Sequence, residues 1–152
     1  MLDPMEWPEI PELVFRLCLA AALGLPIAWD RERRTRSAGL RTYPLVSMGA
    51  CAYVLVGEVF IANPAENPGA TARILQGLLS GIGFIGGGAI LKNDDKVAGT
   101  ASAASIWITG AVGVAVGLGS WSIAITLSVL NLIVVVVLSE IKSRVPTEPE
   151  EF

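Results

Sequence analysis

The chain has 152 residues and a formal net charge of −3, and 53% of its residues are hydrophobic while only 16% are charged. Soluble domains carry about 25% charged residues, and a chain of this length has too little interior to bury such an apolar excess. The composition therefore argues against a disordered chain, a coiled coil, a nucleic-acid-binding protein and a disulfide scaffold, and it predicts a protein that lies in a lipid bilayer. The chain also lacks histidine, the usual zinc ligand and general base near neutral pH.

Five segments are apolar enough to cross a membrane, which takes roughly 20 residues. The uncharged stretch 97–139 is too long for one helix and breaks at the turn 117–120. The predicted spans are 13–29, 42–62, 74–91, 100–118 and 121–138. The first span follows a leader without Lys or Arg, so we expect a helix that is kept rather than a cleaved signal peptide. The sequence thus predicts an all-α, polytopic domain over residues 1–140, a bundle of five transmembrane helices, with a short cytoplasmic tail over 141–152.

The distribution of basic residues predicts how this bundle is oriented, because Lys and Arg gather in short cytoplasmic loops. With five spans, the loops 30–41 and 92–96 and the tail lie on one side and hold most of the basic residues. Arg16 and Arg73 depart from this rule. We therefore expect the N-terminus outside the cell and the C-terminus in the cytoplasm.

Small residues at helical spacing predict which spans pack closely, because helices associate in lipid where their backbones can approach. The third and fourth spans contain glycines that lie three, four or seven residues apart and therefore share helix faces: Gly77, Gly81, Gly83, Gly87, Gly110, Gly113 and Gly117. We therefore expect these two spans to form the tightly packed centre, with the Val-rich fifth span outside. A pore lining or a mobile break in the helix is the functional alternative. The G-x-G-x-x-G pattern at 81–86 follows no strand, so it predicts no dinucleotide site, and we expect no enzyme.

The strongest candidate for a functional site is the charged segment at the end of the first span. Asp30 lies at a helix C-terminus, where the helix dipole disfavours a carboxylate, so it needs a cation from Arg31, Arg34 or Arg41. With Thr42 these residues form a candidate polar site at the cytoplasmic mouth of the bundle, and we expect Arg41 to neutralise Asp30. The alternative is a basic anchor that contacts anionic lipid.

Other polar residues inside the spans have structural explanations. Arg16 and Glu58 lie near the outer surface, where snorkelling or a mutual ion pair accounts for them, although charges within a membrane are also functional candidates. Asp94 and Asp95 favour a solvated turn over a metal site. The hydroxyl groups of the fourth span favour interhelical hydrogen bonds over ligand binding: Thr100, Ser102, Ser105 and Thr109.

Several segments, taken in order, carry a resemblance to a known family. They include Asp30-Arg31-Glu32, residues 38–42, 80–88, 97–100 and 103–107, with the motif residues Arg73, Ser80, Thr100 and Trp107. Together they closely resemble the MgtC/SapB family of bacterial inner-membrane proteins. That family's first-span motif usually reads Gly-x-Glu-Arg, and here Ala28 and Asp30 take the first and third positions. Better-studied members carry an ACT-like cytoplasmic domain after the fifth span, and we expect this chain to correspond to the transmembrane domain without it.

The resemblance implies a protein of the bacterial inner (plasma) membrane that takes part in magnesium homeostasis or adaptation to low magnesium. Two function classes stay open, namely binding or regulating a membrane partner such as the ATP synthase, and transporting Mg²⁺ or another small ion. Mg²⁺ takes an octahedron of oxygens and keeps several waters, and Asp30 is the only candidate ligand, so we favour the first class. Besides the lipid bilayer we expect a homodimer, no nucleic-acid partner, and no cofactor other than a possible Mg²⁺.

Overall fold

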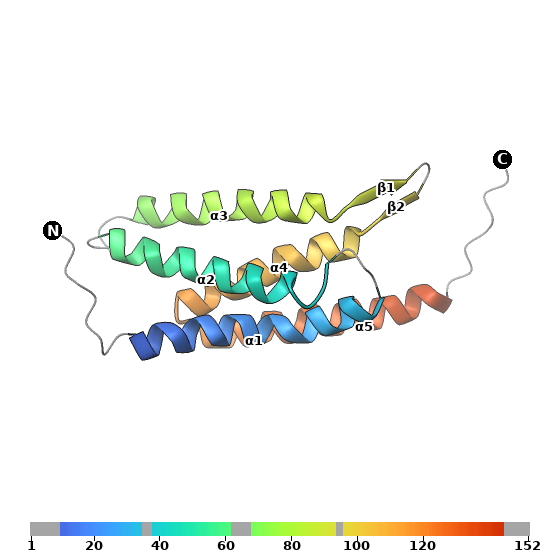
Figure 1. Ribbon diagram of the computed structural model, residues 1–152, viewed down its shortest axis with the longest axis horizontal. Helices are drawn as coiled ribbons and strands as arrows, with labels where there is room; N and C mark the ends of the chain where they lie inside the picture. Colours follow the sequence, from blue (N-terminus) through green and yellow to red (C-terminus); the bar gives the residue numbers. More distant parts are fainter. Residues whose placement is uncertain (1–9, 35–37, 62–67, 94–95, 145–152) are drawn as a thin grey trace.

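The computed structural model describes residues 10–34, 38–61, 68–93 and 96–144. This part of the chain forms a bundle of five helices (Figure 1): α1 (Ile10–Arg34), α2 (Thr42–Phe60), α3 (Pro68–Gly88), α4 (Thr100–Gly117) and α5 (Trp121–Arg144). A short antiparallel pair of strands, β1 (Leu91–Asn93) and β2 (Lys96–Ala98), joins α3 to α4 where only a loop was expected. The predicted helical bundle is therefore confirmed, with this small hairpin as an addition.

Three of the described helices are long and apolar enough to cross a membrane, namely α1, α4 and α5 as far as Lys142. The other two helices each contain one charged residue, Glu58 in α2 and Arg73 in α3. The membrane character is thus supported, whereas five spans remain a prediction. Helix α5 also continues beyond the expected end at residue 138 to Arg144, so most of the predicted tail lies outside the described residues.

Two glycines with positive φ mark the ends of α4. Gly99 (φ 89°) precedes its first residue, and Gly119 (φ 71°) lies in the turn to α5. Positive φ is a conformation that glycine adopts without strain. The predicted break near residues 117–120 is therefore confirmed as a tight turn that folds α5 back along the bundle.

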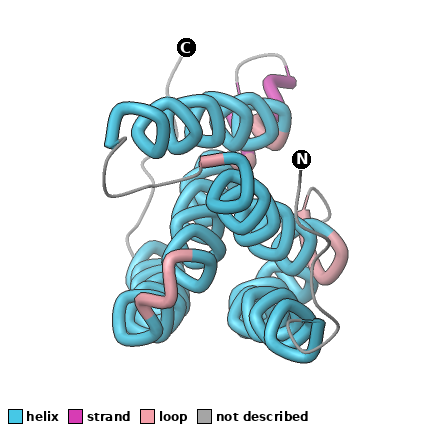
Figure 2. Tube along the Cα trace, turned by 90° about the vertical axis from the view of Figure 1, so that its left-hand side faces the viewer, coloured by secondary structure: helices cyan, strands magenta, loops and turns pink. Residues whose placement is uncertain are grey.

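Helix α4 is the centre of the bundle, and it packs against all four other helices. Figure 2 shows α3 along one edge of the assembly, where it packs mainly on α2 and α4. The closest backbone approach joins α4 to α2. A Cβ on Gly113 would collide with the carbonyl oxygen of Ser47, and a Cβ on Gly117 would lie 2.7 Å from the Cβ of Val54.

The predicted packing role of the α3 glycines is wrong within this chain. A Cβ built on Gly77, Gly81, Gly83 or Gly87 would meet no other atom within 4 Å. Among the α3 glycines that the structure describes, Gly86 makes the close contact, with a Cβ position 3.2 Å from the carbonyl oxygen of Ala103. The tightly packed centre therefore consists of α2 and α4, because glycine spacing alone does not specify which side of a helix meets a neighbour.

Candidate functional site

The basic end of the bundle is the end where α1 finishes, α2 begins and α5 finishes. Its main feature is an ion-pair cluster on α1, which continues as a helix through Arg34. Asp30 Oδ1 accepts a hydrogen bond from Arg34 Nε at 2.8 Å, and Asp30 Oδ2 lies 3.4 Å from Arg31 Nη2. An acid and a base four residues apart share one face of a helix. This pairing extends α1 past its predicted end at residue 29 and offsets the unfavourable dipole at Asp30.

Two members of this cluster are largely withdrawn from solvent. Only 5% of the Arg31 side chain and 12% of the Asp30 side chain are exposed. Burying a charge is costly unless it is paired, so each residue stabilises the other in this position. The Asp30–Arg31 pair is therefore part of the packed fold, whereas Arg34, with 42% of its side chain exposed, faces the surroundings of the bundle.

Arg41 does not neutralise Asp30, contrary to the prediction. In the described part of the chain no ion pair joins these two residues, and Arg41 is exposed just before α2. The turn that holds Arg41 is tied elsewhere, since the Leu40 amide donates to Glu32 Oε2 at 3.0 Å and the Thr42 amide donates to the Gly39 carbonyl at 3.0 Å. Thr42 is the first residue of α2, and it contributes its backbone amide to this turn.

Buried hydroxyl groups of α2 and α4 are a further polar feature, and sequence analysis missed two of them. Tyr43 is fully buried, and its hydroxyl donates to the Ser102 carbonyl at 3.3 Å. The hydroxyls of Ser47 and Ser102 are buried without a hydrogen-bond partner among the described residues. These residues were missed because they stand in an apolar run, and nothing in the sequence shows that Tyr43 and Ser47 are buried in the bundle.

The hydroxyls of α4 behave differently from one another. Thr109 Oγ1 donates to the Ser105 carbonyl of its own helix at 2.7 Å, so it makes no interhelical bond. The same carbonyl accepts from Asn131 Nδ2 of α5 at 3.5 Å. Thr100, which was expected to bond across helices, is exposed at the start of α4.

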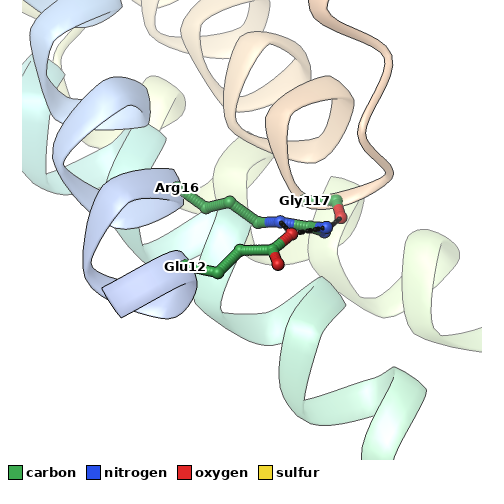
Figure 3. A network of polar contacts seen from close by, with 3 residues as sticks. All are labelled: Glu12, Arg16 and Gly117. Carbon is green, nitrogen blue, oxygen red and sulfur yellow. Dashed lines mark hydrogen bonds and ion pairs between the residues drawn. The ribbon is translucent and has the colours of Figure 1, made fainter. Parts of the chain in front are cut away.

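Arg16 forms a second polar site at the opposite end of the bundle (Figure 3). Its guanidinium pairs with Glu12, and Nη1 donates to the Gly117 carbonyl at 3.1 Å. It also lies 5.8 Å from the centre of the Trp121 ring. Arg16 therefore places a positive charge at the C-terminus of α4, where the helix dipole is negative. The expected ion pair with Glu58 is absent from the described contacts, and Glu58 is exposed.

The family-motif residues do not converge on Asp30. Arg73, Thr100 and Trp107 are exposed, and Ser80 Oγ donates to the Gln76 carbonyl of its own helix at 3.0 Å. Asp94 and Asp95 lie outside the described residues. Among the residues that the structure describes, no three His, Cys, Asp or Glu residues gather as a metal site would require. Cys18 and Cys51 are both free, the first exposed and the second buried.

Comparison with known proteins identifies the family. The profile of the MgtC family matches residues 17–144. The chain is 35% identical to "Putative magnesium transporter YhiD" of Escherichia coli (strain K12) over 136 residues, which is 88% of this chain and 63% of that protein. It is 40% identical to "Protein SrpB" of Synechococcus elongatus over 124 residues, or 74% of this chain and 67% of that protein.

A third relative is "Protein MgtC" of Salmonella typhimurium (strain LT2), 33% identical over 136 residues, or 90% of this chain and 56% of the relative. The chain therefore spans roughly three fifths of the length of such relatives. No solved structure matches it. The length of the family match and these identities lead to one conclusion: the chain belongs to the MgtC family.

Proposed function

We propose that this chain is a bacterial inner-membrane protein of magnesium homeostasis, needed for adaptation to low magnesium, which acts by binding or regulating a membrane partner. The family membership and the names of two relatives, "Putative magnesium transporter YhiD" and "Protein MgtC", support the connection with magnesium. The chain spans only part of those relatives, so its activity is inferred from its own site.

The ion pairs of Asp30 are the observation that favours regulation over transport. Both of its carboxylate oxygens already face a guanidinium, Oδ1 that of Arg34 and Oδ2 that of Arg31. A Mg²⁺ ion would have to displace both cations and then find its other oxygen ligands elsewhere. The centre of the bundle is also filled, because α2 and α4 meet backbone to backbone at Gly113. These contacts favour a rigid binding surface over a path for an ion.

The proposed topology has five spans, an outer N-terminus and a cytoplasmic C-terminus. Its support is the position of the basic residues, since the last turns of α1 and α5 hold Arg31, Arg33, Arg34, Lys142 and Arg144 at one end of the bundle. We also propose a homodimer, because Gly83 and Gly87 of α3 meet no neighbour within this chain and leave a face that a second copy can approach closely. The ATP synthase is a candidate partner that this chain would meet in the same membrane.

Two measurements on the same variants test this function. We expect the purified chain in proteoliposomes to carry no Mg²⁺ flux above that of protein-free vesicles. In cells grown in low magnesium, we expect Asp30→Asn to abolish the growth benefit and Asp30→Glu, which keeps the charge, to preserve it. Both variants are first shown to be folded and present in the membrane. A flux that is lost in Asp30→Asn would overturn the regulatory function and establish the alternative, a transporter or channel for Mg²⁺ or another small ion.

A further inference from the structure

A lateral groove between α2 and α3 is not explained by the Asp30 site. It encloses about 680 Å³, and its walls are mostly aliphatic, with Leu45 and Tyr53 of α2 and Ile85 of α3 along its rim. These three side chains are 59%, 66% and 46% exposed, so they face the surroundings of the bundle. In a membrane, lipid has direct access to this groove.

Glycine residues, which have no side chain, keep the groove open. Gly49 of α2 and Gly77 and Gly81 of α3 line it, and a Cβ built on any of the three would meet no atom within 4 Å. Backbone therefore forms part of its wall, which leaves room for a slender apolar occupant pressed closely against both helices. A flexible acyl chain fits that description.

The length of the groove distinguishes a lipid from a partner helix. Its α3 wall runs from Arg73 to Ile85, which is about 18 Å at the rise of an α-helix. One leaflet contributes roughly 15 Å to the hydrocarbon core, whereas a transmembrane helix must cross about 30 Å. The groove thus matches the tail of one lipid in one leaflet.

Arg73 gives the groove a charged end. It is the one charged residue among the described residues that line the groove, and Glu58 lines a separate recess nearby. Arg73 is exposed, and no ion pair or hydrogen bond of its side chain is present within the described part of the chain. A guanidinium beside an apolar groove complements a phosphate that is joined to an acyl chain, because its planar fork binds phosphate oxygens in pairs.

We propose that this groove binds a single anionic phospholipid, with one acyl chain along Gly49, Gly77 and Gly81 and the phosphate at Arg73. Helix α3 begins at the end of the bundle opposite the basic end and runs to the hairpin (Figure 1). Arg73 lies near the beginning of α3, so it is close to that opposite end. The lipid then belongs to the outer leaflet, an assignment that rests on the proposed topology. The binding itself requires only that the groove faces lipid.

Native mass spectrometry of the purified chain in detergent tests this proposal, with phosphatidylglycerol and phosphatidylethanolamine of the same acyl chains as probes. We expect wild type to retain one phosphatidylglycerol per protomer in preference to phosphatidylethanolamine. Arg73→Gln should weaken this retention about tenfold, the equivalent of one charge-assisted hydrogen bond. Gly77→Leu and Gly81→Leu should weaken it while keeping Arg73, because the new side chains fill the groove.

Matched controls separate the groove from general effects. Arg144→Gln removes an exposed arginine at the other end of the bundle, and Gly83→Leu adds the same bulk to α3 at a glycine that does not line the groove. Both should retain lipid as wild type does, as should Asp30→Asn, so failure here is distinct from failure of the proposed function. Circular dichroism and size-exclusion chromatography confirm that each variant is folded.

Three results would overturn the proposal. One is equal lipid loss in Arg73→Gln and Arg144→Gln, which would show a non-specific charge effect. Another is unchanged retention in both folded leucine variants, which would place the lipid elsewhere. The third is a dimer that Gly77→Leu converts to monomers without any change in bound lipid, which would make the groove an interface with a second copy.

Discussion

Replacing Gly113 by alanine should destabilise the bundle, because no room exists for a single methyl group at this position. The new Cβ would collide with the carbonyl oxygen of Ser47 and lie 2.8 Å from that residue's carbonyl carbon and 2.9 Å from the Cβ of Ala50. Two of these atoms belong to the backbone of α2, so no rotation of a side chain relieves the contact. Helices α2 and α4 must move apart, and overpacking of this kind costs about 1–3 kcal/mol.

The matched variant Gly81→Ala should have the opposite sign. Its Cβ would meet no atom within 4 Å, and alanine is favoured over glycine inside a helix by up to about 1 kcal/mol. The two variants make the same chemical change in neighbouring helices, so their difference isolates the contact with α2. We expect a difference in the free energy of unfolding of roughly 1–3 kcal/mol, which is the cost of the contact alone, because both variants gain the same helix preference of alanine.

Reversible unfolding of the purified chain in mixed micelles, followed by circular dichroism, measures this difference. The backbone contact should also make Gly113→Ser and Gly113→Val progressively worse, while Gly81→Ser stays close to wild type. Equal stability of Gly113→Ala and Gly81→Ala would refute the conclusion that α2 and α4 form the packed centre. It would then restore α3 to the central position that its glycine pattern suggests.

Three further outcomes follow from the polar contacts. Asp30→Asn should lower the free energy of unfolding by roughly 1.5–3 kcal/mol, because a largely buried carboxylate loses its charge-assisted hydrogen bond with Arg34 and its ion pair with Arg31. The exposed Arg41→Gln should stay within about 0.5 kcal/mol, and a large loss in Arg41→Gln would contradict the observed pairing. Arg16→Gln should cost about 0.5–1.5 kcal/mol in the same assay, because the last turn of α4 loses a hydrogen bond, and no change would show that bond to be dispensable. In a cysteine-free background, S120C should react with an impermeant maleimide from outside and K142C should not; the reverse pattern would invert the topology.

The sequence by itself predicted the class of fold, and the physical basis was composition. An uncharged stretch such as residues 97–139 is stable only when it is surrounded by lipid or by a protein core. Its break at Gly119 can be recognised in the sequence because few residues other than glycine adopt that backbone conformation. The pairing of Asp30 with Arg31 and Arg34 could also be predicted from the sequence. Adjacent residues, and residues four apart on one helix, lie close together independently of the tertiary structure.

The tertiary structure decided everything that depends on which helix face meets which neighbour. Glycine spacing in α3 and α4 is similar, yet Gly113 lies against the α2 backbone while Gly77 and Gly81 open into a groove. The contact of Arg16 with Gly117, which joins α1 to the end of α4, could likewise not be predicted, because the two residues are far apart in the sequence. Periodicity shows that a helix has a small or polar face, but the rotation of each helix about its axis is set by the packing of all five together.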